Sequence, residues 1–134
     1  MNSNFIVALQ RSLLALLIFL MANATFALGL GEPTLKSKLG EPLEMEVPVI
    51  NSGDLSTEQL LVGAATNQQY KEFNIEHESI HYSMRYKVVE RQNKLYVEIT
   101  SQKPVKEPYI NILLRLKWPE GEVLKALTVL LDTP

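Results

Sequence analysis

The sequence predicts an all-β domain, an antiparallel β-sandwich of about seven short strands with one or two short helical turns. Three observations lead to this prediction. Apolar residues recur at every second position in several short segments, which is the period of a strand. Turn residues separate these segments at short intervals. The last third of the chain contains two such segments, joined by Pro119-Glu120-Gly121, and this pattern indicates a β-hairpin.

The terminal hairpin is the most clearly patterned element. Its second strand, residues 123–131, alternates in the same way as its first. Both strands are largely apolar on both faces in their middles, which is typical of strands inside a sheet or between two layers. The rest of the chain must therefore cover them. The first strand places five side chains on one side: Ile110, Ile112, Leu114, Leu116 and Trp118.

Two further strands are expected before residue 51, after a flexible apolar lead-in at residues 28–31. Residues 34–39 alternate, and their lysines favour a sheet edge, where a partner strand could also add. Residues 43–50 place four apolar side chains on one face and two glutamates on the other. Pro48 has no N–H group to donate to a ladder, so it indicates an edge or a bulge.

Short helical turns are expected between residues 51 and 76. Ser56-Thr57-Glu58-Gln59 has the Ser-x-x-Gln pattern of a capping box. Residues 60–65 form a candidate short buried strand. Residues 67–74 are expected to form a short helix, capped by its first residue, with Tyr70 and Phe73 facing inward.

A second hairpin is expected in residues 80–101. Residues 80–89 alternate and turn at residues 91–94, and residues 95–101 return with apolar side chains inward. Seven segments of this kind, with few helical turns, predict a sandwich of immunoglobulin-like form. The chain shows no repeat, low-complexity segment or linker, so one domain is expected.

Residues 1–27 have the pattern of a secretory signal peptide. They carry one charge, Arg11, followed by an almost wholly apolar run at residues 12–21 and small residues at Ala22, Ala24 and Ala27. Cleavage is expected after Ala27, so the remaining chain is expected to be exported. The alternative is an uncleaved N-terminal membrane anchor. A buried amphipathic helix fits poorly, because the run is apolar on every side.

Composition excludes several functional classes for the remaining domain, residues 28–134. The whole chain carries a net charge of −2, and loss of Arg11 makes the domain slightly more acidic. An acidic domain with scattered lysines is a poor nucleic-acid binder. The chain contains no Cys, which excludes a thiol nucleophile and cysteine-based zinc sites. A domain of this size can bury enough core to fold without disulfides.

One motif points to zinc chemistry. His77-Glu78-Ser79-Ile80-His81 spells His-Glu-x-x-His, in which two histidines bind Zn²⁺ from one helix face and the glutamate acts as general base. Here the motif enters a predicted strand, where the two imidazoles would lie about 13 Å apart. A third ligand would have to come from Glu98 or Glu107. We therefore expect two solvent-facing histidines, with a zinc hydrolase as a remote alternative.

Other candidate sites have weaker patterns. Asp54, His77 and Ser79 could be named as a triad, but no Gly-x-Ser-x-Gly elbow supports it. Glu44 and Glu46 are expected to form a solvated face rather than a catalytic pair.

An aromatic site is a further alternative. Trp118 is expected to cap the core at the end of its strand. Together with Tyr82 and Tyr86 it could instead form a platform for a sugar or peptidoglycan ligand. The first arrangement requires these rings to be buried, and the second requires them to be exposed in a groove.

Three stretches of the chain resemble the N-terminal domain of the FimV family: "LGLGEPTLKSKLGEPLEMEVPVI" at residues 28–50, "GDLSTEQLLVGAAT" at 53–66, and "SQKPVKEPYINILLRLKWPEGEVLKALTVLLDTP" at 101–134. The His-Glu-x-x-His motif falls between these stretches, in a part that the family pattern leaves variable. The matching residues are Pro42, Leu43, Gly53, Asp54, Leu55, Pro104, Val105, Glu107, Pro108, Trp118, Pro119, Gly121, Thr128 and Asp132.

The resemblance implies a non-enzymatic periplasmic interaction domain, associated with type IV pilus assembly or with envelope or secretion machinery. It implies pilus or envelope proteins as partners and no cofactor or metal, and it names no binding residues. Family members usually continue into a peptidoglycan-binding LysM domain, a transmembrane helix and a cytoplasmic region. The sequence ends at Pro134, so we expect either a free-standing relative or the first part of a longer gene.

Overall fold

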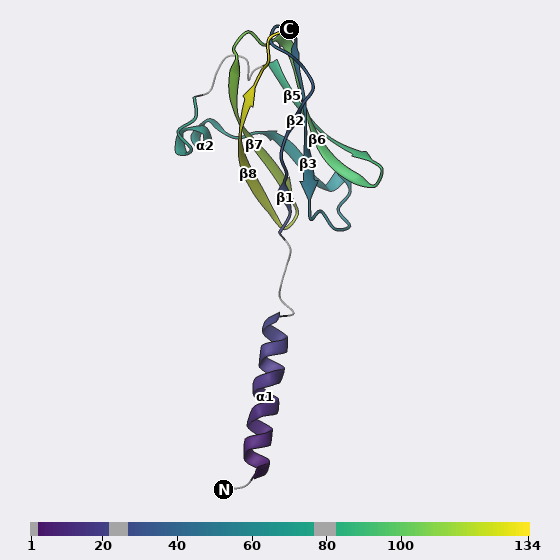
Figure 1. Cartoon of the computed structure of the whole chain (residues 1–134), viewed down its shortest axis with the longest axis vertical. Coiled ribbons are helices and arrows are strands. Elements are labelled where there is room, and N and C mark those ends of the chain that lie inside the picture. The colour runs from purple at the N-terminus through teal and green to yellow at the C-terminus, as the bar shows by residue number, and fades with distance from the viewer. Residues whose placement is uncertain (1–2, 22–26, 77–82) are drawn as a thin grey trace.

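The computed structural model describes residues 3–21, 27–76 and 83–134 (Figure 1). Helix α1, Ser3–Met21, comes first, and its large apolar side chains from Phe5 to Phe19 are exposed. Within the described ranges, no helix has both the length and the apolar character needed to cross a membrane. Among the side chains that the structure describes, none of α1 belongs to the hydrophobic core, and every core side chain lies in residues 28–131.

Two antiparallel sheets follow. The five-stranded sheet has the order β1-β3-β6-β5, and β2 pairs with the same strand, β3, as β1 does. The three-stranded sheet has the order β4-β7-β8. The strands of the first sheet are β1 Gly29–Leu30, β2 Thr34–Leu35, β3 Pro42–Ile50, β5 Met84–Arg91 and β6 Lys94–Pro104. Those of the second are β4 Leu61–Ala64, β7 Tyr109–Trp118 and β8 Gly121–Leu130.

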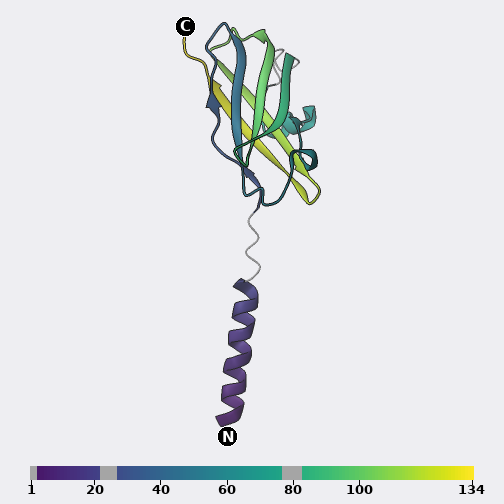
Figure 2. The same cartoon turned by 90° about the vertical axis from the view of Figure 1, so that its right-hand side faces the viewer.

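This strand order confirms the predicted immunoglobulin-like sandwich. If β1 and β2 count as one interrupted edge strand, the two sheets correspond to strands ABED and CFG of a constant-type immunoglobulin domain. In Figure 2, β3, β6 and β5 lie side by side in one layer, and the β7–β8 hairpin forms the other.

The core lies between the two layers and is formed by alternate residues of the long strands. Side chains of β3, β6 and β7 that point inward are almost completely shielded from solvent, as the period of two predicts. Burial of this apolar surface is the main stabilising contribution to the domain. Its most deeply buried members are Leu43, Met45, Val47, Val97, Ile99, Ile110, Ile112, Leu114 and Leu116.

The terminal hairpin is confirmed. β7 and β8 pair along their whole length, from Tyr109 opposite Leu130 to Trp118 opposite Gly121, so the turn consists of Pro119 and Glu120. A Cβ atom on Gly121 would lie 3.2 Å from Cζ2 of Trp118, so the indole ring sits directly against this glycine.

The start of the domain differs from the prediction. Residues 28–31 are not a flexible lead-in, because Leu28 and Leu30 are buried and β1 pairs with β3. The strand expected at residues 34–39 is wrong in extent, since only Thr34–Leu35 forms a ladder. Beyond Leu35, the hydroxyl of buried Ser37 accepts a hydrogen bond from the amide of Glu44 at 2.9 Å. A side-chain acceptor thus takes the place of a backbone carbonyl of the expected strand.

Pro48 faces the break between β1 and β2. The Gly31 amide donates to the Pro48 carbonyl at 2.8 Å, so the missing N–H of Pro48 also points to this side. Three residues of the edge, 31–33, lie opposite two residues of β3 at this point. Pro48 thus marks an irregularity, as predicted, but it lies in an inner strand. Gly31 is required here, because a Cβ atom would lie 2.7 Å from Cγ of Pro48.

Three predictions for residues 56–76 need correction. The 3-10 helix η1, Thr57–Gln59, is present, but β4 is an edge strand with Leu61 69% exposed. Helix α2, Asn67–Glu72, is capped by Thr66 rather than Asn67, because the Gln69 amide donates to the Thr66 hydroxyl. Its length of six residues turns Phe73 outward, so only the tyrosine of the predicted pair is buried.

Candidate functional site

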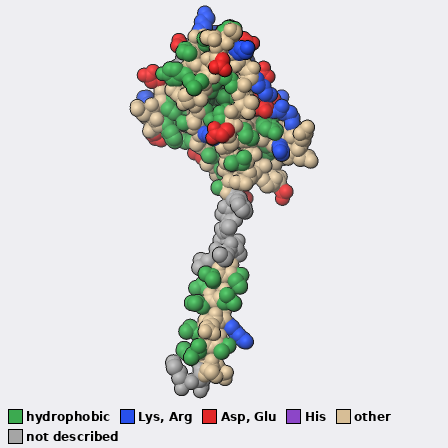
Figure 3. All heavy atoms as spheres, viewed as in Figure 1, with side chains coloured by type: hydrophobic (Ala, Val, Ile, Leu, Met, Phe, Trp, Pro, Cys, Tyr) green, Lys and Arg blue, Asp and Glu red, His purple; other side chains and the backbone are tan. Residues whose placement is uncertain are grey.

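The outer face of the five-stranded sheet is charged. The Glu46 carboxylate lies between Lys36 and Arg91 and forms ion pairs with both. The hydrogen bond from Arg91, followed by that from Lys36, holds the pKa of Glu46 below its ordinary value. The Arg91 guanidinium also lies over the Tyr96 ring, 4.7 Å from its centroid. Figure 3 shows lysines and arginines gathered on the side of β5 and β6.

The outer face of the three-stranded sheet is covered at its centre by α2. β4 separates from β7 after Ala65, whose amide donates to the Leu113 carbonyl at 3.0 Å. The Leu113 amide then donates to the Tyr70 hydroxyl, also at 3.0 Å. Tyr70, Ala65 and Leu113 are buried together in a second, small core, and this burial raises the pKa of Tyr70.

Beyond α2 the same face exposes three large apolar side chains. Phe73, Tyr109 and Leu130 are 47%, 52% and 72% exposed, and we call these three residues the outer apolar patch. Tyr109 and Leu130 are direct cross-strand partners. Phe73 and Tyr109 line one open pocket of about 430 Å³.

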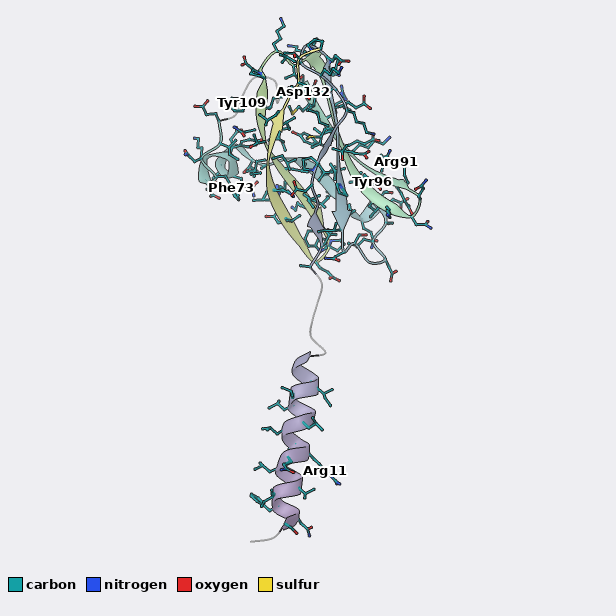
Figure 4. The ribbon with its side chains drawn as sticks, viewed as in Figure 1. Arg11, Phe73, Arg91, Tyr96, Tyr109 and Asp132 are labelled. Atoms are coloured by element: carbon teal, nitrogen blue, oxygen red, sulfur yellow. The ribbon has the colours of Figure 1, made fainter. Side chains whose placement is uncertain are left out.

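The sheet beneath this pocket provides polar groups as well. Thr128 donates a hydrogen bond to the Asn111 side chain at 2.9 Å, and both residues line the pocket. In Figure 4, Phe73 and Tyr109 lie on the α2 side of the domain, whereas Arg91 and Tyr96 lie on the opposite side. Exposed apolar side chains around a hollow with polar groups are typical of a protein-interaction surface.

Sequence reasoning missed this patch. It placed Phe73 inward and gave no role to Tyr109 or Leu130. A signal was available in the terminal hairpin, because Leu130 occupies an outer position of β8 where a solvent-facing strand usually has a polar residue.

Of the two arrangements considered for the aromatic residues, Trp118 and Tyr86 adopt the one packed against the core. Trp118 packs against the core at the end of β7, as expected of a cap, and lines a pocket of about 370 Å³ with the exposed Asp54. Tyr86 lies in the other sheet, also against the core, and burial raises its pKa. The two rings therefore do not form one exposed groove. Tyr82 lies outside the described residues.

The zinc-type motif is not tested by the structure, because His77, Glu78, Ser79 and His81 lie outside the described residues. The candidate triad of Asp54, His77 and Ser79 shares two of these residues and is equally untested. Glu98 lies in the middle of β6, and Glu107 is exposed between β6 and β7. In residues 3–21, 27–76 and 83–134, no group of three His, Cys, Asp or Glu side chains is placed to hold a metal ion.

Comparison with known proteins identifies the family. Residues 28–134 match the model of the "FimV N-terminal domain Ig-like domain". The chain belongs to the FimV N-terminal domain family. The match covers the whole sandwich and begins at Leu28, the first buried residue of its core. This confirms the resemblance found in the sequence.

Relatives in two strains of Pseudomonas aeruginosa carry the name "Motility hub protein FimV". Each is 36% identical to this chain over 118 residues, which cover 86% of this chain and 13% of the relative. The chain thus spans about an eighth of the length of these relatives. Among solved structures, "The BIgI domain of beta protein from S. agalactiae bound to CEACAM1" is 15% identical with a TM-score of 0.42, covering 81% of this chain and 97% of that one.

Proposed function

We propose that residues 28–134 form a non-enzymatic protein-interaction domain that works in the periplasm, in the assembly of type IV pili or related envelope machinery. The observation that carries this proposal is membership of the FimV N-terminal domain family over the whole sandwich. Relatives named as motility hub proteins support a protein-interaction role in motility, because a hub acts by binding other proteins.

The outer apolar patch is the surface that we assign to the partner. Exposure of its three large apolar side chains to water is unfavourable. A partner that covers them removes this surface from water, which favours binding. The pocket lined by Phe73 can admit a partner side chain.

Export is the second part of the proposal. Residues 1–27 act as a signal peptide that is removed after Ala27, and residues 28–134 form the mature domain. The apolar character of α1 and its single charged residue, Arg11, support this division. Fusion of residues 1–27 to a reporter enzyme that is active only outside the cytoplasm tests it, with Leu14→Arg/Leu17→Arg as the export-defective control.

The experiment that tests the interaction uses the mature domain as bait. Residues 28–134 are immobilised and incubated with a detergent extract of the cell envelope, and bound proteins are identified by mass spectrometry. We expect pilus-assembly or secretion components among them. Phe73→Ser combined with Leu130→Ser should reduce their recovery about tenfold or more, since each change removes an apolar contact.

A matched control is available on the same sheet. Leu61 on β4 is 69% exposed but lies away from the patch, at the other end of the β4–β7 ladder. Leu61→Ser should therefore retain wild-type capture. Equal loss in both variants, or capture of unrelated proteins alone, would contradict the proposed function.

A further inference from the structure

The outer edge of β8 is an unpaired backbone edge. The register with β7 decides which backbone groups of β8 are already hydrogen-bonded. Because Trp118 and Gly121 close the hairpin as a pair, the odd-numbered residues of β8 direct their N–H and C=O groups toward β7. The even-numbered residues therefore direct their N–H and C=O groups away from the sheet. Just beyond the strand this is seen directly, since the Asp132 carbonyl accepts from the Leu39 amide at 2.9 Å.

Part of this edge is free along the strand itself. Among the described residues, no backbone hydrogen bond joins the outward groups of Ala126, Thr128 or Leu130 to another segment. These three residues are also exposed. Nearer the turn, β1 approaches β8, where the Lys125 ammonium binds the carbonyls of Leu30 and Gly31. The free part of the edge is therefore centred on Thr128.

Charge distinguishes this edge from the edge of the other sheet. Edge strands are commonly protected from pairing by lysines and other charged residues. β5 follows this rule, with the exposed basic side chains of Arg85, Lys87 and Arg91 on its outer face. β8 does not, because residues 126–130 are uncharged and the nearby Lys125 is bound to the first strand.

We propose that a second copy of this chain pairs with β8 in antiparallel register, to form a six-stranded sheet across a two-fold axis at Thr128. In this register Thr128 faces Thr128 of the second copy, and Ala126 faces Leu130 of the second copy. A threonine pair is a favourable cross-strand contact, and the alanine–leucine pair brings two apolar side chains together. No like charges meet, whereas the same pairing at β5 would bring its basic side chains together. A two-fold interface uses the same patch on both copies, which this strand permits.

The pairing does not depend on the proposed function. It uses the backbone edge of β8 and leaves Phe73 on the open face. The two surfaces share side chains, because Ala126 and Thr128 also line the pocket beside Phe73 and Leu130 also belongs to the outer apolar patch. A domain that pairs without binding pilus proteins, or the reverse, would separate the two proposals.

Sedimentation equilibrium of residues 28–134 tests the proposal, since this fragment contains every core side chain that the structure describes. We expect a concentration-dependent monomer–dimer equilibrium. Thr128→Lys and Thr128→Glu each place like charges on the axis, so each should weaken dimerisation about tenfold or more. A mixture of the two variants brings opposite charges together and should restore the dimer. Leu61→Lys, on the opposite edge of the same sheet, should dimerise like the wild type.

Amide hydrogen exchange provides a second readout that needs no substitution. On raising the protein concentration, exchange should slow at Ala126, Thr128 and Leu130 and stay unchanged at Leu127 and Val129, which already pair with β7. A wild-type domain that stays monomeric up to about 1 mM would overturn the proposal. Dimers that survive both Thr128 substitutions, or a mixture that stays monomeric, would also overturn it.

Discussion

The ammonium group of Lys125 donates a hydrogen bond to the carbonyl of Gly31 at 3.0 Å. The facing residue of β3, Pro48, has no N–H group and cannot supply this bond. Gly31 lies against Pro48, which accepts its amide but has no N–H to return. Lys125 reaches this carbonyl from β8, in the other sheet, and also binds the carbonyl of Leu30 at 3.1 Å. One side chain thereby joins the two sheets where the edge strand is interrupted.

Lys125→Met should lower the free energy of unfolding by about 1–2 kcal/mol, because it leaves two partly buried carbonyls without their charged donor. Chemical denaturation of residues 28–134 measures this value. Lys103→Met, at an exposed position, is the matched control and should stay within about 0.5 kcal/mol of the wild type. Equal effects in both variants would show that the Lys125 contacts contribute nothing specific.

Tyr70→Phe tests how α2 is attached to the sheet. The hydroxyl accepts the Leu113 amide where β4 ends, so its removal leaves a buried N–H group unsatisfied. We expect a loss of about 1–2 kcal/mol in the free energy of unfolding, and faster amide exchange at Leu113. Unchanged exchange at that amide would be inconsistent with this arrangement.

Gly31→Ala should destabilise the domain by about 1–3 kcal/mol, because the added Cβ would lie 2.7 Å from the Pro48 ring. Thermal unfolding is a sufficient measurement. Gly63→Ala is the control, since a Cβ at Gly63 meets nothing within 4 Å. If Gly31→Ala unfolds at the wild-type temperature, the edge strand does not hold this close approach in solution.

Glu46 should make stability depend on acid pH. Its pKa is lowered in the folded state, first by the Arg91 hydrogen bond, so the folded domain binds this proton less readily than the unfolded chain. Its contribution is therefore present above the ordinary glutamate pKa and is lost as pH falls through the lowered value. Glu46→Gln should flatten the decline of stability below about pH 4.5, and Arg91→Met should reproduce most of that change. A Glu46→Gln profile with the wild-type slope would argue against the ion pair.

Much of the fold could be predicted because strand periodicity reports directly on a two-layer core. The alternation of Ile110, Ile112 and Leu114 predicted one face of β7 correctly. The first edge could not be predicted in the same way. Its ladder is interrupted by the contact of Gly31 with Pro48, and this contact joins residues that are distant in the sequence.

The candidate site was harder to predict, because exposure depends on where covering elements end. Tyr70 and Phe73 both suit a helix that packs on a sheet. Only the position of α2, which ends at Glu72, decides that Tyr70 is buried and Phe73 is exposed. In the same way, the alternation of β8 does not reveal that its outer side lacks a covering layer at Leu130.

The central claim is that the outer apolar patch binds an envelope partner in the periplasm. Photo-crosslinking in living cells of the bacterium that encodes the chain tests it most directly, with a photoreactive amino acid at Phe73 and, as control, at Lys94, the exposed first residue of β6 in the charged sheet. The account predicts that Phe73 yields adducts with pilus-assembly or secretion proteins in the envelope fraction and that Lys94 does not. Adducts with cytoplasmic proteins, or the same adducts from both positions, would contradict it.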